Sequence, residues 1–257
     1  MIPKIIHYCW FGRGEMPKLM KKCLKSWKKF CPDWQVVRWD EDSFDVNSTL
    51  WTKQAYEARK FAFVSDYVRL KALYEMGGIY LDTDVELVQT LDKFLDHEAV
   101  SGFESEKLVQ TGVIGAQKGH PVIGRWLEYY KDRAYLVDGK PVMVPNVSHI
   151  TEDLTGAGLV MNDRKQEIDG MVIYPKTWFC PLSAVSIERQ ITENTHALHY
   201  FTSTWRSDKA KKDFARVKRH QRWWYRALEW LRYLPNRLAR KLLGNGTIDQ
   251  IKKKLGR

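Results

Sequence analysis

Residues 61–86, FAFVSDYVRLKALYEMGGIYLDTDVE, contain a complete helix–turn–strand pattern. Apolar residues at positions 61, 64, 68, 72, 73 and 76 have helical spacing, and Gly77–Gly78 is a typical helix stop. The apolar run at 79–81 predicts a short buried strand, which leads directly to Asp82 and Asp84. We therefore expect a helix over 61–76, a strand over 79–81 and two carboxylates at the end of that strand.

The sequence contains a second acidic pair of the same spacing, Asp40 and Asp42, which follows a strand-like run without a glycine lead-in. We expect that pair to lie in a solvated loop or at a helix start. In a fully extended strand, Asp82 and Asp84 would face the same side about 7 Å apart, too far for both to bind one ion directly. One would then bind a metal while the other acts through a water or a ribose hydroxyl, unless the strand bends.

Oxygen ligands at this place favour Mg²⁺ or Mn²⁺, which keep coordination positions open for water and substrate phosphates. Ligands of open α/β sheets collect at the carboxyl ends of the strands, where Asp82 and Asp84 would lie. The residues alone leave a metal site and an acidic turn about equally plausible.

Strand and helix patterns alternate along the first part of the chain, which predicts an α/β sheet with a parallel layer and flanking helices. Further strands and helices are expected downstream of the acidic pair. Strands are expected at 4–9, 34–39, 85–88, 99–103, 112–117, 170–175 and 196–201, and helices at 16–32, 121–137 and 147–158.

The charge is divided unevenly along the 257 residues, whose net charge is +11. Residues 206–257 contain 17 Lys and Arg against 4 Asp and Glu, whereas residues 1–205 have a small net negative charge. We therefore expect a domain over 1–205 and a basic tail over 206–257. The four cysteines have no zinc-like spacing and no run is long enough to cross a membrane, so a reduced, cytoplasmic compartment is the default.

The tail has apolar residues at helical spacing and several aromatic residues among its arginines. This pattern is typical of an interfacial helix that binds anionic lipids. A terminal helix packed on the domain is the alternative, and nucleic-acid binding is not expected because no fold for it is visible. The aromatic residues are Trp223, Trp224, Tyr225, Trp230 and Tyr233.

The segment 62–86 strongly resembles the core motif of glycosyltransferase family 32, the DXD-containing sugar transferases. IPKIIHYCWFG at the start, WDED after the second strand and HYFTSTW near residue 205 are similar to the same family. The resemblance covers residues 1–205. It implies a GT-A fold with a Rossmann-like nucleotide-binding sheet, a metal–diphosphate site at the DXD, and sugar transfer with retention of configuration.

The resemblance also implies roles for individual residues. Asp66 and Arg69 match positions that contact the donor sugar or ribose, although a helix-surface ion pair is the alternative. Asp82 and Asp84 match the DXD, with Asp84 as the expected direct ligand. His199 matches a position that completes the metal site, although a structural histidine at a strand end is possible. The remaining donor-site matches are Tyr80, which is also plausible as a core tyrosine, Ser203 and Trp205 over the diphosphate, and either Tyr8 or Trp10 against the base.

Retention requires either a carboxylate nucleophile or front-face attack, and Glu104 and Asp153 are the carboxylates considered for the first route. We expect a hexosyltransferase that uses a nucleotide sugar, with UDP preferred, and a lipid-linked glycan acceptor. The expected setting is bacterial surface polysaccharide synthesis, as for capsule or O-antigen, on the inner face of the cytoplasmic membrane. The rival is a non-catalytic protein that binds membrane or nucleic acid through its basic tail.

Overall fold

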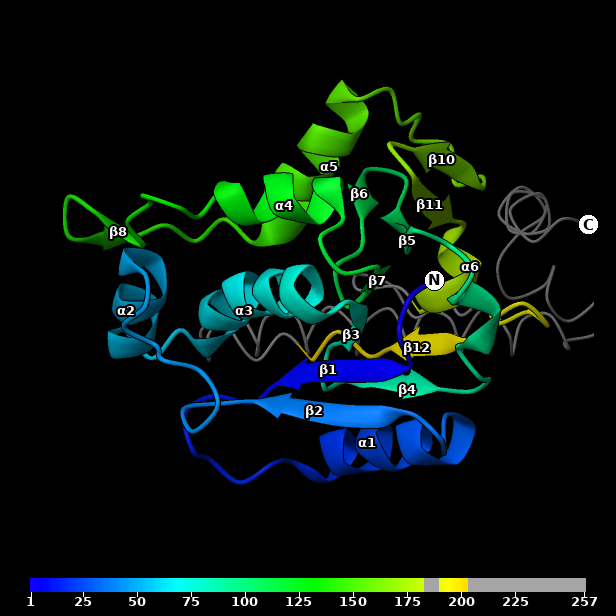
Figure 1. The fold of residues 1–257 in the computed structure, drawn as a ribbon, viewed down its shortest axis with the longest axis horizontal. Coiled ribbons are helices and arrows are strands. Elements are labelled where there is room, and N and C mark those ends of the chain that lie inside the picture. Colours follow the sequence, from blue (N-terminus) through cyan, green and yellow to red (C-terminus); the bar gives the residue numbers. More distant parts are fainter. Residues whose placement is uncertain (183–189, 203–257) are drawn as a thin grey trace, which may run out of the picture. The chain divides into compact units, whose positions relative to one another are not determined.

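The computed structural model describes residues 1–182 and 190–202, which include the whole helix–turn–strand segment (Figure 1). The main sheet has the strand order β10-β11-β5-β7-β3-β1-β2, and β6 pairs with β5. Its strands are β1 (Ile5–Cys9), β2 (Gln35–Trp39), β3 (Gly78–Leu81), β5 (Ala99–Ser105), β6 (Leu108–Val109), β7 (Val113–Ala116), β10 (Gln166–Ile168) and β11 (Met171–Tyr174).

The sheet is mixed. β1 pairs in parallel with both β2 and β3, and β11 pairs in parallel with β5. β7 runs antiparallel to β3 and β5, so the parallel pairing is interrupted at β7, which lies between these two strands in the sheet. The predicted α/β sheet with flanking helices is confirmed.

Helices cover both faces of this sheet, and the predicted helices at 16–32, 61–76 and 147–158 are present. α2 lies in a stretch for which the sequence pattern predicted no helix. The helices are α1 (Lys18–Phe30), α2 (Leu50–Glu57), α3 (Phe61–Met76), α4 (Pro121–Glu128), α5 (Asn146–Gly156), α6 (Lys176–Phe179) and the 3₁₀ turn η1 (Asp92–Phe94).

Two apolar cores lie on opposite faces of the sheet, because successive side chains of a strand point in opposite directions. Within β3, Tyr80 joins the core shared with α3 and α4, whereas Ile79 and Leu81 join the core shared with α1. Trp27 of α1 is fully buried in the second core and donates its indole N–H to the carbonyl of Val85 at 2.8 Å. The end of β3 is therefore fixed from both faces.

Two glycines connect α3 to β3, and no other residue type fits at either position. Gly77 has φ +69° and Gly78 has φ +109°, which are backbone conformations that side chains disfavour. A Cβ at Gly77 would lie 2.8 Å from the amide nitrogen of Lys118, and one at Gly78 would lie 2.7 Å from the carbonyl oxygen of Ile5. The pair lets the chain leave the helix and enter the sheet within two residues.

Two small ribbons lie outside the main sheet. β4 (Val85–Leu87) pairs antiparallel with β12 (Ala197–His199), and β8 (Leu136–Val137) pairs with β9 (Lys140–Pro141). The second ribbon corrects the helix expected over 121–137, because α4 ends at Glu128. Asp138 and Gly139 both have positive φ and form the hairpin turn. Asp-Gly is a common hairpin-turn sequence, but the helical spacing before it led to the prediction of a helix.

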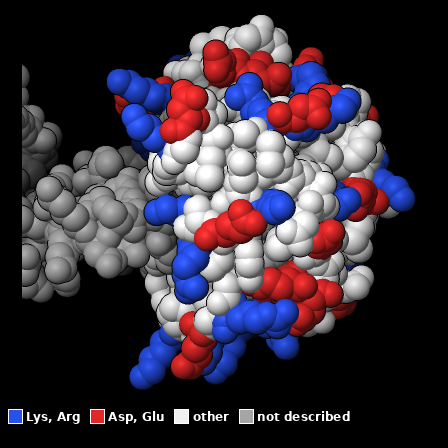
Figure 2. Space-filling model, turned by 90° about the vertical axis from the view of Figure 1, so that its left-hand side faces the viewer, with Lys and Arg blue, Asp and Glu red and all other residues white. Residues whose placement is uncertain are grey.

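The surface at the end of the molecule where α2 and β8 lie carries charges of both signs. Figure 2 shows basic and acidic side chains interspersed with uncharged ones on this face. Among the described residues, no helix is long and apolar enough to cross a membrane. The predicted basic tail, 206–257, lies outside the described residues.

Candidate metal and donor site

The antiparallel ribbon of β4 and β12 brings a distant histidine to the acidic pair. His199 lies opposite Val85 in the ribbon, and the amide of Tyr200 donates to the carbonyl of Asp84 at 3.0 Å. Asp84 directly precedes Val85, so strand pairing alone places His199 beside it. Two segments more than a hundred residues apart thus meet through backbone hydrogen bonds.

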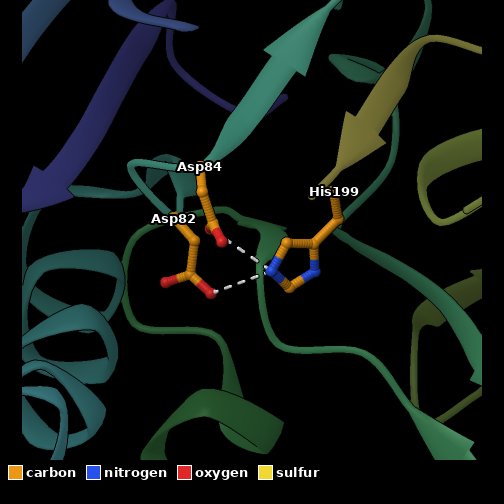
Figure 3. Close-up of side chains that lie close together, drawn as sticks. All are labelled: Asp82, Asp84 and His199. Atoms are coloured by element: carbon orange, nitrogen blue, oxygen red, sulfur yellow. Dashed lines mark ion pairs between the residues drawn. The ribbon is translucent and has the colours of Figure 1, made fainter. Parts of the chain in front are cut away.

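Asp82, Asp84 and His199 form one compact cluster (Figure 3). Nε2 of His199 lies 3.3 Å from Oδ1 of Asp84 and 3.9 Å from Oδ2 of Asp82. One potential ligand atom from each residue lies within 4.8 Å of the others. The strand bends, which is the alternative left open for this pair: the chain turns after β3, and the amide of Val85 donates to the carbonyl of Asp82 at 2.9 Å. Both carboxylates can therefore face the same ion.

Each carboxylate has one oxygen engaged by the protein and one oxygen facing His199. Oδ2 of Asp84 accepts hydrogen bonds from the amide and the hydroxyl of Thr202, at 2.8 Å each. Oδ1 of Asp82 accepts from the Tyr80 hydroxyl at 2.9 Å and lies 3.3 Å from the Arg69 guanidinium. The surrounding residues thus fix both carboxylates while leaving one oxygen of each for a shared ligand.

The electrostatics of the cluster favour a cation. Burial opposes ionisation of Asp84, but His199 and the two Thr202 hydrogen bonds outweigh it and hold the pKa of Asp84 well below its usual value. Burial would likewise lower the pKa of His199, but Asp84 outweighs it and raises that pKa well above the usual value. Two carboxylates beside a histidine that is deprotonated on binding give the net negative charge that suits a divalent cation.

The space beside the cluster depends on Gly112, which precedes β7. A Cβ at this position would lie 3.0 Å from the His199 ring and 3.1 Å from Oδ2 of Asp82. Its carbonyl accepts the amide of Asp82 at 2.8 Å, so the backbone approaches the acidic turn closely. The set of two carboxylate oxygens and one imidazole nitrogen, with room next to it, fits Mn²⁺ or Mg²⁺.

Arg69 links the helix α3 to this cluster. The guanidinium lies 3.1 Å from Asp66 and 3.3 Å from Asp82, donates to the carbonyl of Thr111 at 2.8 Å, and lies over the ring of Tyr80. Burial would lower the pKa of Arg69, but the neighbouring charges, chiefly Asp82, raise it. Burial raises the pKa of Asp66 to about 6. Asp66 and Arg69 are both buried, so the alternative of an ion pair on the helix surface is wrong.

The two aromatic candidates for base stacking differ in their surroundings. Tyr8 is 8% exposed, and its ring packs edge-on against Trp27 in the core. Trp10 directly follows β1, is partly buried, and donates its indole N–H to the carbonyl of Gly14 at 2.8 Å. Trp10 thus has the more accessible ring at the carboxyl end of β1, where a base would bind.

The two nucleophile candidates lie in different places. Glu104 near the end of β5 has a pKa raised by burial, and it is close enough to His199 and Asp82 for their charges to act on it. Asp153 lies on α5, where it pairs with Arg125 at 3.0 Å and accepts the indole N–H of Trp126 at 2.8 Å. The described contacts of Asp153 do not include the cluster. Ser203 and Trp205 lie outside the described residues.

The competing sequence features have structural roles. Asp40 and Asp42 lie in a turn after β2, where Asp42 is exposed and pairs with Arg13. Asp40 is buried, so the solvated position expected for the pair holds for Asp42 alone. The nitrogen Nδ1 of His196 lies 2.7 Å from the carbonyl oxygen of Thr90, so His196 has a structural contact and does not belong to the cluster. Thr202 and Gly112 were missed by the sequence analysis. Thr202 lies within the HYFTSTW motif, which could have indicated it, whereas no sequence signal distinguishes Gly112.

Comparisons with known proteins find similarity over the part of the chain that contains the acidic pair. Residues 17–101 match the family described as a glycosyltransferase sugar-binding region containing a DXD motif. The inositol phosphoceramide mannosyltransferase 3 of Schizosaccharomyces pombe is 35% identical over 126 residues, which is 48% of this chain and 35% of that protein. The mannosyl phosphorylinositol ceramide synthase CSH1 of Saccharomyces cerevisiae is 26% identical over 143 residues, which is 53% and 38%. The alignments thus span little more than a third of these relatives.

A solved structure of the galactosyltransferase LgtC with donor and acceptor sugar analogs is 14% identical, with a TM-score of 0.42, and covers 83% of this chain and 94% of that one. The sequence match and the geometry agree on one feature: Asp82 and Asp84 fall within the region that resembles the DXD-containing sugar-binding region of glycosyltransferases. The predicted resemblance to the DXD-containing sugar transferases is confirmed as a similarity over this part of the chain.

Proposed function

We propose that the chain is a metal-dependent, retaining hexosyltransferase that uses a nucleotide sugar as donor. The observation that carries this proposal is the convergence of the DXD carboxylates with His199 within 4.8 Å. Retention is proposed from the resemblance to family 32. Two carboxylates this close to a histidine suit a metal better than glycoside hydrolysis, in which the carboxyl groups flank the scissile bond.

Asp82, Asp84 and His199 would hold Mn²⁺ or Mg²⁺ through the oxygens and the nitrogen that face one another. The bound cation supplies charge neutralisation at the donor diphosphate, where negative charge develops as the glycosidic bond breaks. Thr202 and Tyr80 keep the two carboxylates in orientation through the hydrogen bonds described above.

Arg69 and Asp66 are proposed to act at the donor sugar. Arg69 is held between Asp66 and Asp82, so its position is coupled to that of the metal-binding turn. Trp10, at the carboxyl end of β1, is the better candidate for stacking on the base because its ring is less buried than that of Tyr8. Ser203 and Trp205 are proposed, from the family motif, to close over the diphosphate.

The acceptor is proposed to be a lipid-linked glycan in surface polysaccharide synthesis. The names of the yeast relatives describe mannosyl transfer to an inositol-phosphate ceramide, which supports a hexose donor and a lipid-borne acceptor. UDP is the first donor nucleotide to test, and a GDP-linked mannosyl donor is the second. The basic, aromatic tail 206–257 is proposed to hold the enzyme on the cytoplasmic face of a membrane.

A thermal-shift panel of UDP and GDP sugars, with and without Mn²⁺, tests the donor and metal together. We expect one nucleotide sugar to raise the melting temperature only when Mn²⁺ is present, because a ligand that binds the folded state stabilises it. Asp84→Asn should abolish that shift. No Mn²⁺-dependent shift with any sugar nucleotide would contradict the proposal.

Truncation after Ser207 tests the role of the tail. The full chain should pellet with vesicles that contain anionic lipid, and the truncated chain should remain in the supernatant. Equal pelleting of the two forms would show that the tail does not hold the enzyme on the membrane.

A further inference from the structure

A cavity of about 310 Å³ lies between the end of β5 and the segment that follows α6. Glu104 and Ser105 line it from β5, and Cys180, Pro181 and Leu182 line it from the segment after α6. The volume is at the lower end of the range for small-molecule sites and is sufficient for one sugar ring. The residues that line this cavity have no metal or donor role in the description above. Glu104 is among them and has been named only as a candidate nucleophile.

The cavity adjoins the metal cluster through two of its lining residues. The sulfur of Cys180 lies 4.0 Å from Nδ1 of His199, on the side of the ring opposite to the carboxylates. Glu104 is close enough to His199 and Asp82 for their charges to affect it. A molecule in the cavity would therefore lie next to the reacting centre without occupying the space between the metal ligands.

The lining has the chemical character of a sugar site. Its charges are balanced, with Glu104 and Glu106 against Lys107 and Lys176, so it does not select a strongly charged ligand. Carboxylates accept and ammonium groups donate hydrogen bonds, which together suit hydroxyl groups. Pro181 and Leu182 add apolar surface for the C–H face of a ring, and Gln190 and Ser105 add further polar groups.

We propose that this cavity is the acceptor subsite and that it takes a neutral pyranose ring at the end of the acceptor glycan. The inference rests on the proposed glycosyltransferase function and deepens it. Glu104, at the side of the cavity near His199, accepts a hydrogen bond from an acceptor hydroxyl. Lys176, on α6, donates to a second hydroxyl and sets the ring's orientation.

The test uses the full chain with Mn²⁺ and the sugar nucleotide that it hydrolyses. Octyl glucopyranoside, galactopyranoside and mannopyranoside are the neutral acceptor probes, and octyl glucuronide is the anionic probe. The KM values for acceptor and for donor are measured separately for the wild type, Glu104→Gln and Lys176→Met. Lys118→Met is the matched control, since Lys118 is exposed and lies outside the cavity lining.

We expect at least one neutral glycoside to be an acceptor. Both cavity variants should raise its KM about tenfold or more, and in Lys176→Met the donor KM should change less than twofold. Lys118→Met should change neither value by more than twofold. Circular dichroism and melting temperature identify any variant that fails to fold, and the other cavity variant then provides the test.

Three results would overturn the inference. They are unchanged acceptor KM values in both folded variants, a wild-type preference for octyl glucuronide over every neutral glycoside, and donor hydrolysis without transfer to any probe. Each of these leaves donor hydrolysis intact, so the proposed function would still stand. Absence of both hydrolysis and a Mn²⁺-dependent thermal shift would instead overturn the proposed function, and the acceptor subsite with it.

Discussion

Thr202 donates both its backbone N–H and its hydroxyl to Oδ2 of Asp84, at 2.8 Å in each case. Thr202 lies three residues after His199, so one short segment provides a candidate ligand and the groups that orient another. The segment 199–202 therefore provides one candidate ligand atom, Nε2 of His199, and also orients the Asp84 carboxylate that would provide another.

Thr202→Val should weaken Mn²⁺ binding while the fold is retained, because only the hydroxyl contact to Asp84 is lost. Partners that orient metal ligands typically contribute 10- to 100-fold in affinity or activity. Titration of Mn²⁺ by electron paramagnetic resonance measures the change. Thr202→Ser keeps the hydroxyl and should retain most of the affinity. Equal affinity in the valine variant and the wild type would show that the backbone N–H alone orients Asp84.

His199→Gln should affect metal binding, whereas His196→Gln should affect stability. The His199 variant should lose Mn²⁺-dependent activity by about 100-fold or more, because one of three ligand atoms is replaced by a weaker one. The His196 variant should lower the melting temperature, since His196 contacts Thr90 and stacks on Trp178, while Mn²⁺ affinity changes little. Calorimetric Mn²⁺ titration of both variants separates the two roles. Similar affinities in the two variants would remove His199 from the proposed site.

Arg69→Met should reduce the free energy of unfolding by about 3–5 kcal/mol, because it leaves the buried Asp66 without its cation. Arg125→Met is the matched control, since its ion pairs with Asp153 and Asp169 are much more exposed. The control should lose only about 1 kcal/mol or less. Urea denaturation at neutral pH measures both. Equal losses of unfolding free energy in the two variants would mean that burial does not determine how much the Arg69 ion pairs contribute to stability.

Gly112→Ala should impair Mn²⁺ binding more than stability, because its Cβ would lie 3.0 Å from the His199 ring and 3.1 Å from Asp82. Gly156→Ala is the control within α5, where an added Cβ meets no atom within 4 Å. The control should gain up to about 1 kcal/mol from helix propensity and keep its Mn²⁺ affinity. Unchanged Mn²⁺ affinity in Gly112→Ala would show that the site adjusts to the methyl group.

His149 should make the protein less stable in mild acid. Burial and the charge of Arg133 lower the pKa of His149 to about 4, although Asp153 opposes this, and its ring stacks on Tyr129 and meets Tyr130 edge-on. The unfolded state, with a pKa of about 6.5, binds the proton first, so stability falls as pH decreases from 6.5 towards 4. His149→Phe should remove on the order of 2 kcal/mol of the loss between pH 7.5 and pH 4.5.

Urea denaturation of the wild type and His149→Phe at the two pH values measures this difference. The remaining acid sensitivity, from carboxylates elsewhere, should be common to both proteins. Parallel losses in the two proteins would contradict the assignment to His149.

The segment 61–86 could be read from the sequence because its structure is determined locally. Helical spacing, the Gly77–Gly78 stop and the apolar run at 79–81 each have a near-neighbour cause, and the structure contains α3 and β3 where the pattern predicts them. The same holds for the turn at Asp40 and Asp42.

The geometry of the acidic pair could not be read in this way. Whether Asp82 and Asp84 share an ion depends on the turn after β3, and that turn is fixed by Gly112 and by the ribbon with β12. Periodicity carries no information about such non-local contacts. The helix expected over 121–137 failed for a related reason, because the hairpin at Asp138–Gly139 overrides the helical spacing before it.

The pairing of β4 with β12 sets the order in which the site can assemble during synthesis. The carboxylates leave the ribosome early, although β3 still lacks its neighbour β7 at that point, and their histidine follows more than a hundred residues later. Until residues 197–202 emerge, two acidic groups lie at the edge of the sheet with neither His199 nor the Thr202 hydrogen bonds. The candidate three-residue site is therefore completed only after the chain has been made through His199 and Thr202.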